Sequence, residues 1–152
     1  HLSLRRQRQM CIRDRFSNDT NALKAVSSGQ CGVTIVNTYY LARLLDDPEY
    51  NNLSLFWANQ SDRGVHVNIS GAGVVKTSKN KKNAVLLLEY LSSNKAQDFY
   101  ASANKEYPVL IGAKIDESIE NWGSFSEHTI NVSKLGSLQK EAVFLAQEVG
   151  YK

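Results

Sequence analysis

The pattern of apolar and polar residues predicts a chain that alternates between helices and short strands. Apolar residues recur at helical spacing in five segments: 21–28, 39–45, 84–91, 96–103 and 138–149. Runs that are rich in β-branched residues or that alternate strictly are typical of strands, and they fall at 32–36, 53–57, 65–69 and 74–75. Because the two kinds of segment alternate, the pattern favours an α/β fold with a mainly parallel sheet.

Several residues mark where the predicted helices begin and end. Gly29 follows the first helix in the position that favours a C-terminal glycine, and Pro48 stops the second. Ser92 or Ser93 can cap the helix that follows. The last helix is expected to start after Ser137 and to bury one apolar stripe, formed by Leu138, Ala142, Leu145 and Val149.

Composition and charge divide the chain into a basic tail and a nearly neutral body. Of its 152 residues, 42% are hydrophobic and 22% are charged, so the chain is long enough for one domain with a core. The net charge of +3 comes from residues 1–15, which contain five arginines and one aspartate. This tail lacks periodicity and resembles translated adapter sequence, so we treat it as non-native. Because the body has no basic face, we expect no nucleic-acid partner.

The sequence lacks the motifs of the common catalytic and metal sites. Two cysteines and three histidines form neither CxxC nor HExxH, and no GxxxxGK[ST] phosphate loop is present. No strictly apolar run is longer than that at 84–88, which is far shorter than the roughly 20 residues of a membrane-spanning helix. The body has no recognisable nucleophile–base pair, so we do not expect an enzyme.

Tyr39 and Tyr40 are the most informative residues, because they lie where the strand predicted at 32–36 gives way to a helix. Ligands of open α/β sheets bind beyond the carboxyl ends of strands. Adjacent helix residues point about 100° apart, so both phenols reach one cleft only near the helix start. A phenolate is a hard oxygen donor suited to a trivalent cation, and a bound metal can ionise a phenol whose pKa is otherwise about 10. The spacing alone also fits two tyrosines that pack this corner with their hydroxyls in water.

Four motifs follow one another along the body. They are GQCG with VNTYYL at 29–41, RGVHVNISGAGV at 63–74, NKKNA at 80–84 and EYPV at 106–109. In type, order and spacing they resemble the motifs of ferric-iron substrate-binding proteins of bacterial ABC transporters. The resemblance covers essentially all of 16–152 and implies a two-lobed α/β fold, the type II periplasmic binding fold. It also implies that this chain is an incomplete C-terminal fragment of that fold.

The resemblance implies an Fe(III) site in which Tyr39 and Tyr40 are consecutive ligands. Asn37 matches a position that contacts a synergistic anion beside the iron in some members of the family. The family's other ligands, tyrosine and often histidine, come from the N-terminal half. No segment here matches them, so we expect an incomplete iron site. Cys31 either pairs with a cysteine of that half or is a buried thiol.

The resemblance also implies a division of the fragment and a role for the whole protein. Residues 16–67 are expected to form part of the second lobe, 68–73 the crossing between lobes, and 74–152 a part that packs mostly on the first lobe. The whole protein would be periplasmic and monomeric, and it would deliver iron to an ABC permease in the inner membrane. The alternative is a binding protein of the same fold for a polyamine, thiamine or an organic anion.

Overall fold

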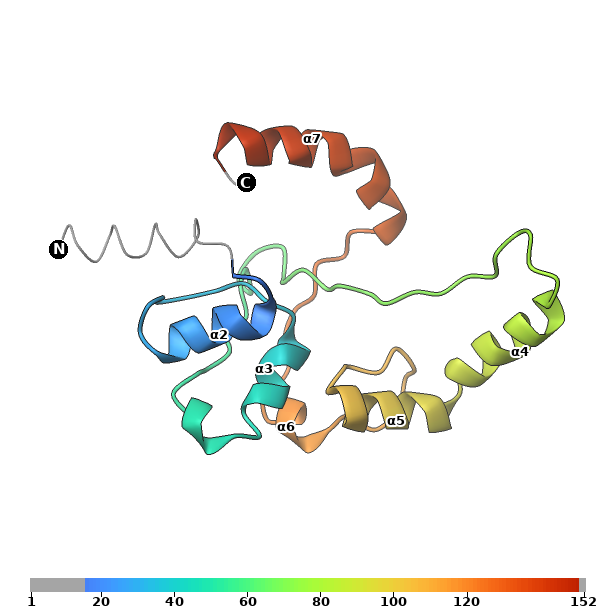
Figure 1. The fold of residues 1–152 in the computed structure, drawn as a ribbon, viewed down its shortest axis with the longest axis horizontal. Coiled ribbons are helices and arrows are strands. Elements are labelled where there is room, and N and C mark those ends of the chain that lie inside the picture. The colour runs from blue at the N-terminus through green and yellow to red at the C-terminus, as the bar shows by residue number, and fades with distance from the viewer. Residues whose placement is uncertain (1–15, 151–152) are drawn as a thin grey trace.

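The computed structural model describes residues 16–150, in which helices are joined by long extended segments (Figure 1). The basic tail, 1–15, lies outside the described residues. The elements in chain order are α2 (Asp19–Ser27), α3 (Thr38–Leu44), the 3₁₀ turn η1 (Pro48–Tyr50), α4 (Lys81–Leu91), α5 (Asn94–Asn104), α6 (Glu117–Glu120), the 3₁₀ turn η2 (Val132–Lys134) and α7 (Leu135–Glu148).

The helix boundaries follow the local signals in the sequence. Gly29 closes α2 with a φ of 76°, a conformation that glycine adopts without strain. The hydroxyl of Ser93 accepts a hydrogen bond from the amide of Ala96 at 3.4 Å, so Ser93 is the N-cap of α5. The last helix begins at Leu135, earlier than predicted, because η2 leads directly into it.

The predicted sheet is not formed within the described residues. The β-pairing between residues 16 and 150 consists of one isolated parallel bridge, which joins Val65 to Glu127. The segments predicted as strands are extended but lie without a neighbouring strand. A strand is stable only when its backbone groups are bonded to a neighbour. The prediction of a sheet inside this part of the chain is therefore wrong, although the extended conformation of its segments was predicted correctly.

The core of the described residues is small, and its buried side chains lie mainly on α2, α3, α5 and α6. Its buried side chains are mostly alanines and leucines, and Ile119 on α6 is the largest that is completely buried. The core consists of Ala22, Leu23, Ala25, Cys31, Leu41, Ala42, Ala96, Ala101 and Ile119.

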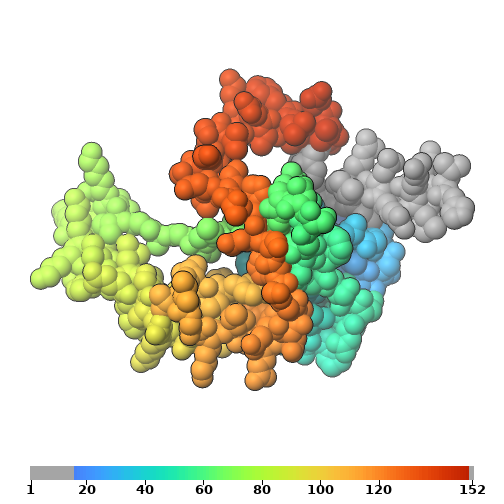
Figure 2. Space-filling model, turned by 180° about the vertical axis from the view of Figure 1, so that it is seen from behind, coloured from blue at the N-terminus to red at the C-terminus, as the bar shows by residue number. Residues whose placement is uncertain are grey.

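Two helices lie away from this core. In Figure 1, α7 stands apart from α2 and α3, and α4 lies at the end of a long extended segment that leaves the core after residue 66. Figure 2 shows both helices projecting from the main body. No residue of α4 or α7 is buried, so the apolar stripe expected to be buried on α7 faces outward here. A surface helix keeps such a stripe only to pack it against another element.

Two loops that are far apart in the sequence contact each other. The amide of Val65 donates to the carbonyl of Ser126 at 2.9 Å, and the amide of His128 donates to the carbonyl of Val65 at 2.8 Å. Trp57 stacks on Phe125 with ring centroids 4.2 Å apart. The predicted division into 16–67, 68–73 and 74–152 stays a prediction, because these contacts do not define lobes.

Candidate metal centre

The first turn of α3 brings the predicted site residues together. Tyr39 and Tyr40 are both half-buried, and their ring centroids lie 4.5 Å apart with the planes tilted by 43°. Asn37 occupies the N-cap of α3 with extended backbone angles, but its side chain does not cap the helix. Instead, its Oδ1 accepts a hydrogen bond from Nδ2 of Asn68 at 3.3 Å. The three residues therefore gather at one helix end, as the sequence predicted, and Asn68 joins them.

Several neighbouring groups oppose ionisation of Tyr39. The pKa of its phenol is raised, chiefly by a hydrogen bond with Tyr40 and then by burial. The charges of Tyr40, Asp19 and Glu106 act in the same direction. This environment opposes a free phenolate. A metal bound here would therefore have to displace the phenolic proton.

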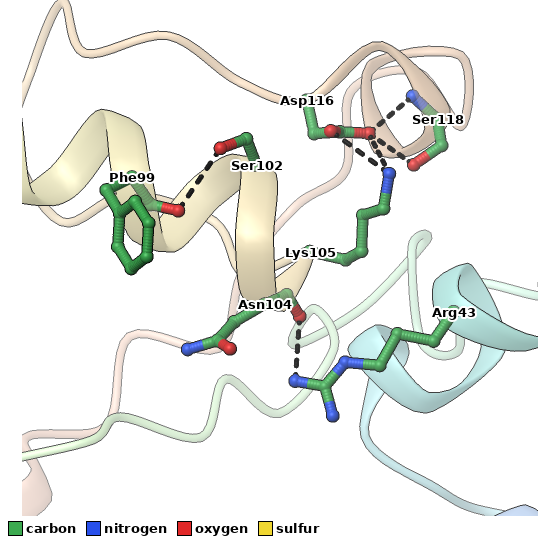
Figure 3. Close-up of polar contacts among 7 residues, drawn as sticks. All are labelled: Arg43, Phe99, Ser102, Asn104, Lys105, Asp116 and Ser118. Carbon is green, nitrogen blue, oxygen red and sulfur yellow. Dashed lines mark hydrogen bonds and ion pairs between the residues drawn. The ribbon is translucent and has the colours of Figure 1, made fainter.

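Arg43 is a neighbour that the sequence analysis did not identify. Its guanidinium carbon lies 5.2 Å from the ring centroid of Tyr39, and its Nη2 donates to the carbonyl of Asn104 at 3.1 Å (Figure 3). The spacing of four residues between Tyr39 and Arg43 places them on one helix face, and that signal was available in the sequence. Arg43 therefore links the tyrosine pair to the end of α5.

The residue after Asn104 begins a second polar cluster (Figure 3). Lys105 has a left-handed backbone, with a φ of 59°, and its Nζ lies 3.1 Å from both carboxylate oxygens of Asp116. Asp116 also accepts hydrogen bonds from the amide and the hydroxyl of Ser118. The hydroxyl of Ser118 is the main cause that lowers the pKa of Asp116, and Lys105 adds to it. This cluster ties α5 to α6.

Other side chains with metal-binding chemistry do not join the tyrosines. His66 is exposed on an extended segment. Tyr107 packs edge-on against Phe125 and donates to the carbonyl of Ile119 at 3.4 Å, and burial raises the pKa of its phenol. Cys31 is buried and disulfide-bonded, which excludes a buried thiol. Across residues 16–150, no three His, Cys, Asp or Glu side chains are grouped so that they could hold a metal ion.

The tyrosine pair lies outside two hollows of the described surface. One is lined by α2 and η1 and the other by α5 and α6. Neither contains Tyr39 or Tyr40.

In the part of the chain that the structure describes, no helix is long and apolar enough to cross a membrane.

Comparison with protein families decides the class of protein. Residues 14–98, more than half of the chain, match the profile of the family described as bacterial extracellular solute-binding protein. The chain belongs to this family. The family's description gives the binding of a solute as the property that its members share. The sequence of this solute-binding protein is 43% identical over 146 residues to iron uptake protein A1 of Synechocystis. The match covers 92% of this chain but only 41% of that protein.

Solved structures establish the fold of this solute-binding protein. It superposes with a TM-score of 0.82 on a Trichodesmium protein solved in complex with iron and citrate, at 42% identity. With the ferric binding protein of Campylobacter jejuni the TM-score is 0.84 at 32% identity. These matches cover 90% and 91% of this chain, but 45% and 46% of the two solved chains. The chain therefore folds as under half of a type II periplasmic binding protein, as the resemblance implied.

Proposed function

We propose that this chain is part of an extracytoplasmic Fe(III)-binding component of an ABC iron-uptake transporter, and that Tyr39 and Tyr40 ligate the iron as phenolates. The observation that carries the proposal is the placement of two half-buried phenols side by side at the start of α3. The relatives support it, because one is named an iron uptake protein and another was solved with iron and citrate.

The chemistry of the site suits a hard trivalent cation. Fe(III) displaces the phenolic protons and gains two anionic oxygen ligands on one helix turn. Asp19 and Glu106 add negative charge close to Tyr39, which attracts the cation before the phenols ionise. The hydrogen bond to Oδ1 of Asn37 leaves the Nδ2 donors of Asn37 to contact a synergistic anion beside the iron.

The rest of the proposal concerns the whole protein. We place residues 16–67 in the second lobe, 68–73 at the crossing and 74–152 mostly against the first lobe, which would supply the remaining iron ligands. The whole protein acts in the periplasm as a monomer and delivers Fe(III) to a permease of the inner membrane. The family's description as extracellular solute-binding protein supports this location.

The ligand assignment is tested in a hybrid protein. In the hybrid, this chain from residue 16 onward replaces the matching part of Synechocystis iron uptake protein A1. Loading with Fe(III) citrate should give a visible phenolate-to-iron charge-transfer band. Tyr39→Phe and Tyr40→Phe should each weaken the band and lower the iron affinity by more than about 100-fold. Mutation of a residue that only hydrogen-bonds to a metal ligand already lowers metal affinity about 10- to 100-fold.

The control is Tyr90→Phe on α4, an exposed tyrosine that is 53% accessible. Each substitution removes one hydroxyl and keeps the ring, so the fold is preserved in all three variants. The band of Tyr90→Phe should equal that of the unmodified hybrid. A hybrid whose band is unchanged in both Tyr39→Phe and Tyr40→Phe would show that these residues are not ligands.

A further inference from the structure

Asn37 has the backbone of a capping residue but does not cap its helix. Its φ of −71° and ψ of 140° nearly equal the −67° and 137° of Asp116, the N-cap of α6, whose side chain accepts from the amide of Ser118. Asn18 and Asn131, at the N-caps of α2 and η2, accept from backbone amides in the same way. The side chain of Asn37 makes no such bond, although a cap of this kind stabilises a helix.

Asn68 holds this side chain instead. Nδ2 of Asn68 donates to Oδ1 of Asn37 at 3.3 Å, across 31 residues of sequence. Departures from a local rule of folding are expected at functional sites, and here a local cap is given up for a distant partner. Tyr39 and Tyr40 lie on the helix turn that Asn37 begins. The contact with Asn68 therefore belongs to the neighbourhood of the proposed iron ligands.

The bond determines which atoms of the Asn37 amide remain available. A side-chain amide has an acceptor oxygen and a nitrogen with two donor hydrogens, and rotation of the amide exchanges their places. Because Oδ1 of Asn37 is turned toward Asn68, Nδ2 is turned away from it. Within residues 16–150, the Asn37 side chain makes no other hydrogen bond. This half-buried amide thus offers two donors while its oxygen is occupied.

We propose that Asn68 is a positioning residue of the iron site, which orients the amide of Asn37 so that its two Nδ2 donors face the anion beside Fe(III). The inference rests on the proposed function and deepens it, because it names what selects the anion. A group that only donates favours an oxyanion such as citrate, whose carboxylate oxygens only accept. With the amide reversed, Oδ1 would meet those oxygens, and two acceptors repel each other.

Asn68→Asp reverses the amide while Asn37 stays in place. A carboxylate has acceptors and no donor, so Asn37 must turn Nδ2 toward it and present Oδ1 to the anion. The test uses the iron-loaded hybrid with Synechocystis iron uptake protein A1 and equilibrium dialysis of radiolabelled citrate. We expect the dissociation constant of citrate to rise at least about tenfold, because hydrogen bonds to a charged group are lost. Bound iron is counted in the same samples, so that loss of iron is not mistaken for loss of citrate.

Two further variants separate the orientation of the amide from the added charge. Ser70→Asp is the matched control, since Ser70 is exposed on the same extended segment and makes no hydrogen bond within the described residues. It adds the same charge but keeps the bond from Asn68 to Asn37, so the dissociation constant of citrate should change less than about threefold. Asn68→Leu removes the bond without adding charge. It should give an intermediate dissociation constant, because the Asn37 amide then adopts both orientations.

A double substitution distinguishes orientation of Asn37 from a general effect on the fold. In an Asn37→Ala background the two donors are absent. There, Asn68→Asp should change the dissociation constant of citrate no more than Ser70→Asp does. A purely structural role of Asn68 would give the same loss in both backgrounds.

Three results overturn the proposal. They are equal effects of Asn68→Asp and Ser70→Asp, an effect of Asn68→Asp that persists with Asn37→Ala, and an iron-loaded parent hybrid that binds no citrate. The phenolate ligands are judged separately, by the charge-transfer band of Tyr39→Phe and Tyr40→Phe. A band that weakens in those variants while citrate binding does not depend on Asn68 refutes this inference alone. The reverse result refutes the ligand assignment and leaves Asn68 as the residue that orients Asn37.

Discussion

The contact between the loops at 57–65 and 122–128 depends on one glycine. Gly64 is buried with a φ of 84°, and a Cβ added there would lie 2.6 Å from the carbonyl carbon and the carbonyl oxygen of Glu127. Both neighbours are backbone atoms, so a flexible side chain cannot move aside. Gly64→Ala should therefore force the two loops apart.

The cost has two parts. A non-glycine residue in the left-handed conformation costs roughly 1–2 kcal/mol. Separation of the loops also breaks two hydrogen bonds, Val65 to Ser126 and His128 to Val65, each worth about 1 kcal/mol. The expected loss is thus about 3–4 kcal/mol, a large fraction of the 5–15 kcal/mol that stabilises a typical domain.

Gly29→Ala is the matched control, because Gly29 has a φ of 76° but nothing within 4 Å of an added Cβ. It should cost only the conformational part, roughly 1–2 kcal/mol. Urea unfolding of the hybrid protein measures both variants. The fluorescence of Trp57 reports on the contact, since Trp57 stacks on Phe125 at 4.2 Å. Equal losses in the two variants would refute the argument that the close approach of the loops excludes a side chain at Gly64.

Two further predictions concern the ends of α5 and α6. The folded state lowers the pKa of Asp116, chiefly through the Ser118 hydroxyl. The charged carboxylate therefore stabilises the folded state at pH values above the unfolded pKa of about 3.9. This stabilisation is lost as the pH falls through the folded pKa. Asp116→Asn keeps a side chain that can cap the helix, so the free energy of unfolding from urea titrations should fall less between pH 7 and pH 2 than it does in the parent. An equal fall in the variant and the parent would contradict this prediction. Ser93→Ala removes the α5 cap and should cost about 1 kcal/mol. Ser102→Ala, whose hydroxyl bonds to Phe99 within α5, should cost much less, and equal costs would contradict the cap assignment.

Local signals in the sequence predicted the helices well because they act over a few residues. Gly29 and Ser93 act through their own backbone angles or hydroxyl and the nearest turn. The sequence therefore placed the end of the first helix and limited the cap of α5 to Ser92 or Ser93, of which the structure shows Ser93. The placement of Tyr39 and Tyr40 at the start of α3 was also predictable, since it depends on where one helix begins.

The sheet and the burial of α7 could not be predicted correctly because both depend on which segments lie beside them in space, and local patterns do not specify that. A β-branched run such as 32–36 indicates a strand, but its pairing requires a neighbour that the run does not specify. Likewise, the periodicity of α7 indicates an apolar face without indicating what covers it. The stack of Trp57 on Phe125 joins residues far apart in sequence, and no local pattern reveals it.

If Tyr39 and Tyr40 ligate Fe(III) as proposed and the remaining ligands come from the other lobe, this division has a physical consequence for delivery. Tyr39 and Tyr40 belong to one rigid turn and stay together, so a change in affinity must come from ligands that approach from elsewhere. Closure brings those ligands in and excludes water, which strengthens each charge interaction at the ion. Opening leaves the ion on two phenols in a wet, half-open site, where water and small anions compete for it. Under that proposal, a protein that carries iron and then releases it keeps only part of the ligand set on each lobe, and Tyr39 and Tyr40 on the first turn of α3 are the part that this chain would supply.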